Sequence, residues 1–173
     1  MQEDLFNWYV IQTKAGDEEK IKEKVDKLKI ENLKTFLPKR KLLLRKKGKF
    51  FYALKALYPG YFFVNFKFEP SIVKKLKKIQ GLIKILSNKN GIPKQVPPNE
   101  MSLIFSLTNE NEIILPSEAF FVNDKIKIIS GPLLGLEGQI TAVDKRKKRV
   151  KVKLPFFNSF KELYLSYELV EKI

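Results

Sequence analysis

The stretch Leu57-Tyr58-Pro59-Gly60-Tyr61-Phe62-Phe63-Val64-Asn65-Phe66 decides how the first half of the chain folds. Proline presets φ for the first corner of a turn and glycine accepts a positive φ, so a turn is predicted over Tyr58–Tyr61. The apolar run that follows is too short for a helix, and its aromatic and β-branched residues are typical of a central strand. Tyr61 and Phe63 are expected to be buried there. For Tyr58, burial at the start of the strand and exposure as a docking residue both stay open.

Strand and helix patterns alternate around this strand. Other strands are predicted over residues 7–13, from Thr35 and over 82–86, and helices near Gly16, from Pro70 and after Pro98. Strand–helix–strand–strand–helix–strand is the split βαβ arrangement. Residues 1–108 are therefore predicted to form an α+β domain, an antiparallel sheet with helices.

Charge is the strongest compositional signal, with 34 Lys+Arg against 19 Asp+Glu and a net charge of +15. Residues 1–108 carry 23 basic and 10 acidic side chains, a net of +13, and residues 119–173 carry 11 and 6, a net of +5. Such an excess indicates a polyanionic partner, nucleic acid before anionic membrane. A lysine-rich organism is the alternative explanation for a good part of the excess.

Cysteine and histidine are both missing from the sequence. Their absence removes disulfides, thiolate catalysis, most zinc sites and the usual general base, so no catalytic residue, metal or cofactor is predicted. The first four residues, Met1-Gln2-Glu3-Asp4, are acidic where a signal peptide is basic, and no apolar run approaches the roughly 18 residues that span a bilayer. A cytoplasmic monomer with no membrane partner is expected.

A basic segment, Lys39–Lys49, carries seven cations in eleven residues. Gly48 indicates a hairpin tip. A solvated, disordered loop and a phosphate-binding hairpin both stay open, and arginine slightly favours the second because its guanidinium can bind phosphate at two points. The candidate RNA-binding residues of this segment are Arg40, Lys41, Arg45, Lys46, Lys47 and Lys49.

The second half is predicted to be entirely β. Residues 109–118 lack periodicity and are interpreted as a linker. Short strands over 125–130, 137–144, 149–154, 161–166 and near Val170 suggest a small five-stranded barrel in residues 119–173.

One strip of that barrel is strongly basic. A hairpin tip near Lys147 is followed by a strand whose alternate positions 149, 151 and 153 are all cationic. Binding to an RNA backbone is favoured, and an edge strand protected by lysine against aggregation is the alternative. The candidate residues are Arg146, Lys147, Lys148, Arg149, Lys151 and Lys153.

Three motifs in order give the chain a resemblance to the NusG family of transcription elongation factors. Trp8–Gln12 is similar to the family's opening strand, Tyr58–Val64 to its aromatic-Pro-Gly-Tyr signature, and Gly131–Gly138 to its KOW loop. The resemblance implies an NGN-like domain linked to an SH3-like KOW barrel. Where the family's barrel carries Phe-Gly-Arg, this chain has Phe157-Asn158-Ser159, so the usual contacts to Rho or to a ribosomal protein are not implied.

The resemblance also implies a partner. The first domain of NusG-like proteins docks through a hydrophobic depression on the clamp helices of the β′ subunit of RNA polymerase, which suppresses pausing or termination. By motif position, the polymerase-binding residues would be Tyr9, Tyr58, Pro59, Gly60, Tyr61 and Phe63. The basic segment, with Phe36-Leu37-Pro38 before it, looks more like the specialised LoaP type of antiterminator, which is recruited by a nascent RNA hairpin at particular operons.

Two other classes of function compete with the elongation factor. KOW barrels also occur in ribosomal proteins, so a ribosome- or translation-associated RNA-binding protein is the alternative. An exposed Tyr58 beside a hydrophobic hollow would favour the elongation factor. An enzyme is not expected, because the chain has neither a phosphate-binding glycine-rich loop before a helix nor paired carboxylates in a recognisable frame.

Overall fold

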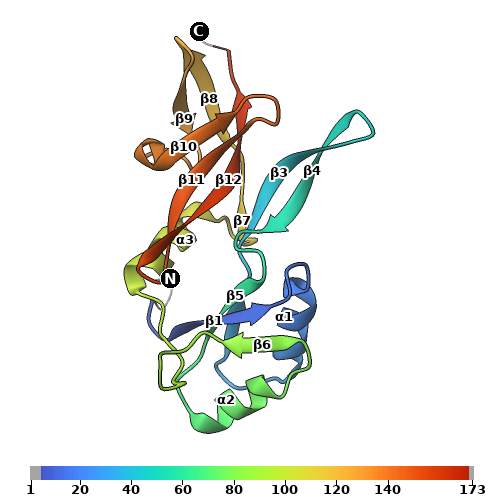
Figure 1. The fold of residues 1–173 in the computed structure, drawn as a ribbon, viewed down its shortest axis with the longest axis vertical. Coiled ribbons are helices and arrows are strands. Elements are labelled where there is room, and N and C mark those ends of the chain that lie inside the picture. Colours follow the sequence, from blue (N-terminus) through green and yellow to red (C-terminus); the bar gives the residue numbers. More distant parts are fainter. Residues whose placement is uncertain (1–4, 172–173) are drawn as a thin grey trace. The chain divides into compact units, whose positions relative to one another are not determined.

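The computed structural model describes residues 5–171 and divides into two compact units (Figure 1). Unit 1 comprises Met1–Pro38 and Tyr58–Leu103, and unit 2 comprises Lys39–Leu57 and Ile104–Ile173. The acidic start over residues 1–4, on which the expected lack of a signal peptide depends, lies outside the described residues.

A four-stranded sheet forms the centre of unit 1. Its strand order is β2-β5-β1-β6, with β1 at Trp8–Thr13, β2 at Lys34–Phe36, β5 at Tyr61–Asn65 and β6 at Leu82–Ile85. Every neighbouring pair is antiparallel. The predicted α+β fold with an antiparallel sheet is thereby confirmed, and β5 is the strand that the aromatic run predicted.

Three helices accompany the strands: α1 (Glu18–Lys27), α2 (Pro70–Lys77) and α3 (Pro98–Leu107). α1 packs against β2 and β5, and α2 packs against β6. Helical spacing predicts one apolar stripe of Ile21, Val25 and Leu28. Ile21 and Val25 are buried, whereas Leu28, just past the end of α1, is 40% exposed. Over the part of the chain that the structure describes, no helix is long and apolar enough to cross a bilayer.

Both faces of the sheet in unit 1 are buried near β1. Residues paired across two strands share a face. The pairs Val10↔Phe63 and Phe36↔Phe63 therefore place these three side chains on one face of the sheet. The ring of Phe36 lies 6.0 Å from that of Trp8 and 5.9 Å from that of Phe63. The next residue along β1 points to the other face, where Tyr9 packs 4.8 Å from Phe66.

The basic segment forms a hairpin in unit 2. Strand β3 (Lys39–Lys46) pairs antiparallel with β4 (Lys49–Ala56), and Lys47 and Gly48 both have positive φ (51° and 77°), as a type I′ turn requires. The predicted hairpin tip at Gly48 is confirmed, and the disordered-loop interpretation is wrong. A short strand, β7 (Ile113–Ile114), pairs parallel with β3, so the segment interpreted as a linker contains a strand.

The rest of unit 2 is a five-stranded sheet of order β10-β11-β12-β8-β9. Its strands are β8 (Ser117–Val122), β9 (Lys125–Ser130), β10 (Ile140–Asp144), β11 (Arg149–Phe156) and β12 (Ser159–Leu169). β8 was missed because its small buried residues, Ser117 and Ala119, do not stand out as a strand pattern. The last two predicted pieces are one strand, β12, and residues 137–139 form a 3₁₀ turn before β10 instead of starting it.

The KOW-like loop is seated on β8. A Cβ added to Gly131, which has φ +97°, would lie 2.8 Å from the Cα of Ser117. The Ser117 hydroxyl also accepts a hydrogen bond from the backbone N–H of Leu133, at 2.8 Å. The glycine that opens the loop is therefore required both by its φ and by the close approach of the neighbouring strand.

Candidate functional site

Three hydrogen bonds fix the turn between Tyr58 and Tyr61, one within the turn and two to other segments of unit 1. The N–H of Tyr61 donates to the carbonyl of Tyr58 (2.9 Å), and Gly60 takes φ +87° at the third position, as in a type II turn. The N–H of Thr13 donates to the carbonyl of Gly60 (2.7 Å), and the N–H of Gly60 donates to a carboxylate oxygen of Glu18 (2.7 Å). The predicted turn and its positive φ are confirmed.

Glu18 is a structural residue that the sequence did not reveal. Its carboxylate also accepts the N–H of Gly16, at 3.1 Å and 3.0 Å to its two oxygens, and the side chain is buried. The sequence placed it with Glu19 as acid in the first turn of a helix, where the helix dipole favours negative charge. Two acids next to each other gave no signal that one of them faces a turn 42 residues further along the chain.

Tyr58 lies inside unit 1, with only 1% of its surface exposed. Its ring meets that of Phe63 edge-on at 6.1 Å. Burial first, and then the negative charge of Glu100 in the first turn of α3, raise the pKa of the Tyr58 phenol well above its usual range. Of the two alternatives left open for Tyr58, the structure shows burial. The exposed alternative is wrong, because Phe63 in β5 and Glu100 in α3 pack around the ring, and the second of these lies far away in sequence.

The six residues named as polymerase-binding do not form one surface. Tyr9 and Phe63 are buried and point to opposite faces of the sheet, since Tyr9 is paired with Val64 and Val10 with Phe63. Gly60 is buried in the turn. The parts of the motif that reach the surface are the exposed Pro59 and the half-buried Tyr61. The expected burial is therefore confirmed for Phe63 but not for Tyr61, the first residue of β5.

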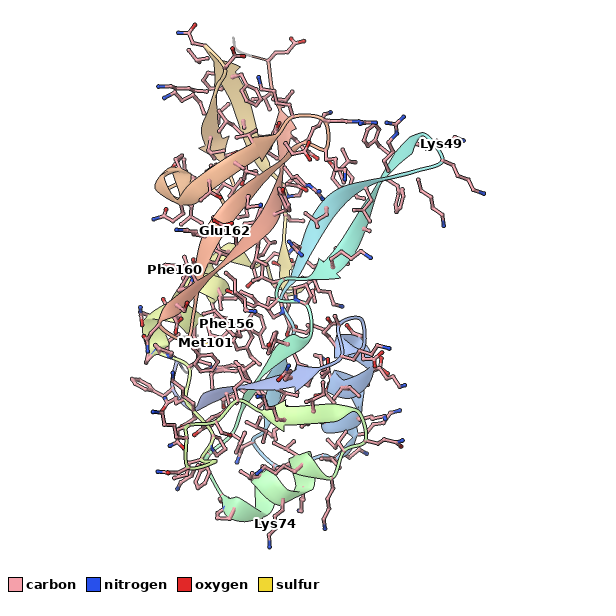
Figure 2. The ribbon with its side chains drawn as sticks, viewed as in Figure 1. Lys49, Lys74, Met101, Phe156, Phe160 and Glu162 are labelled. Carbon is pink, nitrogen blue, oxygen red and sulfur yellow. The ribbon has the colours of Figure 1, made fainter. Side chains whose placement is uncertain are left out.

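In unit 2 the tip of the β3–β4 hairpin is fully accessible. Arg45, Lys46, Lys47 and Lys49 are all exposed, and Figure 2 shows Lys49 at the tip. Arg40 and Lys41, nearer the base of the hairpin, are half-buried. The guanidinium of Arg40 donates to the carbonyls of Ala56 (3.3 Å) and of Tyr164 in β12 (2.9 Å).

The basic strip of β11 alternates as predicted. Val150, Val152 and Leu154 point into the core, and the three cations between them point away from it. Two of those cations lie over the ring of Tyr164, Arg149 at 4.2 Å and Lys151 at 5.3 Å from its centre. Lys153 is exposed. In the loop before β11, Arg146 and Lys148 are exposed and Lys147 is half-buried.

The two basic segments meet at Tyr164. Arg40 donates to its carbonyl and Arg149 covers its ring. Burial lowers the pKa of Arg40, and the nearby positive charge of Arg149 lowers it further. Arg149 also lies 3.7 Å from the carboxylate of Asp144. Tyr164 was not named from the sequence, because nothing local distinguishes it from the other aromatic residues of β12. Arg40 and Arg149 hold the surface together, while the cations at the tip and in the loop remain available for a ligand.

Among residues 5–171 no three His, Cys, Asp or Glu side chains gather as a metal site requires.

The similarity that decides the family concerns unit 1 and the hairpin. The model of the NusG family, described as transcription termination factor nusG, matches residues 6–105, more than half of the chain. The chain belongs to the NusG family. A KOW motif model matches residues 122–153, as the loop at Gly131 predicted.

Relatives of this NusG-family chain match it over nearly its whole length. The transcription termination/antitermination protein NusG of Rickettsia prowazekii is 27% identical, covering 95% of this chain and 89% of that protein. The protein of the same name from Borreliella burgdorferi is 26% identical, with 96% and 98% covered. A solved structure described as domain interaction in Thermotoga maritima NusG matches with a TM-score of 0.56 at 26% identity, covering 93% of each chain. The NGN and KOW composition is thereby confirmed, and membership of this non-enzymatic family confirms that the chain is not an enzyme.

Proposed function

We propose that this chain is a transcription termination/antitermination factor that binds the β′ clamp helices of RNA polymerase and promotes processive elongation. The observation that carries this proposal is the Tyr58–Tyr61 turn, which lies inside the family-matched region and is fixed by Glu18 and Thr13. A turn held this rigidly presents Pro59 and Tyr61 in one conformation, so little conformational entropy is lost when a partner binds.

The polymerase contact assigned to the turn differs from the one that motif position alone implies. Pro59 and Tyr61 would touch the polymerase, while Tyr58 and Phe63 would support them from the interior. Tyr9, on the other face of the sheet, is left without a contact role in this proposal.

The second part of the proposal concerns RNA. A nascent RNA hairpin would recruit the factor at specific operons, as in the LoaP type, by binding the exposed cations of the β3–β4 tip and of the β10–β11 loop. Residues 39–57 carry eight basic and no acidic side chains, a local charge that favours phosphate over any protein surface of ordinary composition. Arg40 and Arg149 join these two regions into one unit.

The proposed domain organisation keeps a polymerase-binding domain at 1–108, a connection at 109–118 and a KOW domain at 119–173, in a cytoplasmic monomer. The assignment of the β3–β4 hairpin to one of these domains differs between the sequence comparison and the structure. The family model includes it in the first domain, whereas its hydrogen bonds to β7 and β12 group it with the second. A hairpin with ties to the KOW half suits a factor in which RNA contacts come from both halves of the sequence.

The decisive experiment is co-purification with core RNA polymerase at moderate salt. Tyr61→Ala is expected to reduce retention, because it removes a half-buried aromatic that the turn presents at the surface. Tyr58→Phe, which keeps the buried ring, and Phe68→Ala, which removes a 43% exposed aromatic elsewhere in unit 1, should be retained like wild type. Wild type failing to bind polymerase while still binding RNA would overturn the proposal and favour a ribosome- or translation-associated KOW protein.

A further inference from the structure

Strand β4 exposes a row of large apolar side chains. The exposed fractions are 47% for Phe50, 44% for Phe51, 39% for Tyr52 and 48% for Leu54. In the sheet order β4-β3-β7 this strand is the edge. An edge strand that exposes aromatic rings invites aggregation unless something covers it, and contiguous exposed apolar surface of this kind marks a binding site.

Cations accompany two of these rings on one face of the hairpin. The register Arg45↔Phe50 and Leu43↔Tyr52 puts both rings on the same face. The guanidinium of Arg45 lies 5.6 Å from the centre of the Phe50 ring, and the ammonium of Lys41 lies 5.0 Å from that of Tyr52. The Tyr52 hydroxyl donates to a carboxylate oxygen of Glu168 (3.0 Å), which fixes the direction of this ring.

We propose that this face, consisting of Phe50, Tyr52, Arg45 and Lys41, is a stacking platform for unpaired bases of a single nucleic-acid strand. Aromatic rings that alternate with cations along a groove or strand are the recurring means of binding single strands, with bases stacked on the rings and phosphates next to the cations. The proposal deepens the RNA-binding part of the proposed function and rests on it. It assigns the lysines and arginines to the phosphates and the aromatic rings to the bases.

The spacing of alternate residues along a strand favours an unpaired strand over a stacked duplex as the ligand. Residues two apart on one strand are separated by about 6.6 Å. That is about twice the 3.4 Å between neighbouring nucleotides in one strand of a duplex. Neighbouring bases can therefore each meet one ring only if the strand is extended and unpaired, as in the loop of an RNA hairpin. In a duplex the faces of the bases are covered by their neighbours.

The test is a binding titration of the full-length chain against three labelled probes: a twelve-nucleotide oligouridylate, an oligothymidylate of the same length, and a duplex of that length. Phe50→Leu combined with Tyr52→Leu keeps apolar bulk but removes both rings. Affinity for the single strands should fall by about five-fold or more, the order seen when one stacking ring is lost. The dependence on salt should stay unchanged, because it counts phosphate contacts.

Phe160→Leu is the matched control. Phe160 is 63% exposed and lies at the start of β12, away from Lys49 (Figure 2). This variant should bind all three probes like wild type. An equal loss of affinity for oligouridylate and for oligothymidylate in the double leucine variant would show that base stacking, which both strands share, decides binding. Binding of the duplex alone would overturn the platform.

A second variant reports on stacking directly. The natural chain has one tryptophan, Trp8, which is buried at 5% exposure, so Phe50→Trp adds a single accessible indole. Its emission should be quenched when the oligouridylate binds. Suppose that wild type binds the oligouridylate, that the double leucine variant binds it equally well and that the Phe50→Trp emission is not quenched. In that case the platform is wrong, while RNA binding stands. If wild type binds no probe, the RNA-binding part of the proposed function fails with it.

Discussion

Tyr58 illustrates what a motif can and cannot predict about a single side chain. Proline followed by glycine predicted the turn and the positive φ of Gly60, because both follow from the covalent structure of those residues. The exposure of Tyr58 depends on Phe63 and on Glu100, and the second of these lies 42 positions away. No local pattern encodes that neighbour, so the sequence left the alternative open and the packing decided it.

The buried phenol of Tyr58 predicts a loss of stability in alkali. In the unfolded chain a tyrosine titrates near its ordinary pKa of 10.0, whereas burial keeps the folded phenol protonated to higher pH. The contribution is fully present below about pH 10. Above it, the free energy of unfolding falls by about 1.4 kcal/mol per pH unit until the folded phenol also ionises.

Denaturant unfolding between about pH 8 and pH 11 checks this, with Tyr58→Phe as the variant, because the phenylalanine has no proton to lose. Its stability should fall less steeply with pH than that of wild type. The fall should not vanish, because burial also raises the pKa of Tyr9, Tyr52 and Tyr167. Parallel pH curves for the two proteins would contradict the assignment.

Glu18 should contribute more to stability than its neighbour in sequence. Glu18→Ala leaves the N–H groups of Gly16 and Gly60 without their carboxylate acceptor, at a cost of about 1–3 kcal/mol for a buried donor. Glu18→Gln keeps one acceptor oxygen and should lose less. Glu19→Ala, at an exposed position, should change stability by about 0.5 kcal/mol or less. Equal thermal midpoints for Glu18→Ala and Glu19→Ala would show that the carboxylate does not hold the turn.

The β3–β4 hairpin was predictable in outline but not in its connections. Its tip followed from a glycine in a basic run, whereas its two strands were not predicted. The bond from Arg40 to the Tyr164 carbonyl spans 124 positions of sequence and could not be anticipated. The aromatic row of β4 was readable as Phe50-Phe51-Tyr52 after the lysines, yet nothing local indicates that these rings face solvent.

The exposed cations of the hairpin predict the salt dependence of RNA binding. Changing Arg45, Lys46, Lys47 and Lys49 to glutamine should reduce the slope of log affinity against log salt by about 0.7 for each phosphate of a single strand that the variant no longer neutralises. Arg146, Lys147 and Lys148 in the β10–β11 loop should behave in the same way. Arg149 is left intact in both variants, because it packs on Tyr164 and its loss would disturb the fold.

The matched control for this measurement removes four charges from α2 and its C-cap in unit 1, with Lys74, Lys75, Lys77 and Lys78 changed to glutamine. Lys74 is labelled on that helix in Figure 2. The control has the same net charge as the hairpin variant, so it separates local contacts from the general field of the protein. If both variants shift the slope equally, the hairpin cations are only a solubility device of an edge strand.

The chain as a whole was predicted in its two halves but not in how its segments group. Alternating patterns indicated the sheet of unit 1 and most strands of the KOW half, because those patterns follow from which side chains are buried. The segment between the two halves could not be predicted from local patterns. Ile113 and Ile114 pair with β3, and Ser117 and Ala119 are buried in β8, contacts that only the assembled sheets reveal.

Polymerase and RNA contacts on separate surfaces should make the intact factor a bridge. A labelled RNA hairpin should be retained by immobilised RNA polymerase only when the wild-type chain is present. Tyr61→Ala should abolish this retention while leaving direct RNA binding unchanged, because the turn lies in unit 1 and the exposed basic groups named for RNA lie in unit 2. The variant with four glutamines at the hairpin tip should weaken it while remaining bound to polymerase at moderate salt, because the cations of the β10–β11 loop are left in place. Mixing the two variants must not restore retention, since each molecule would lack one contact. Restoration to the wild-type level by the mixture, or retention at that level by either variant alone, would show that one molecule does not join the two partners.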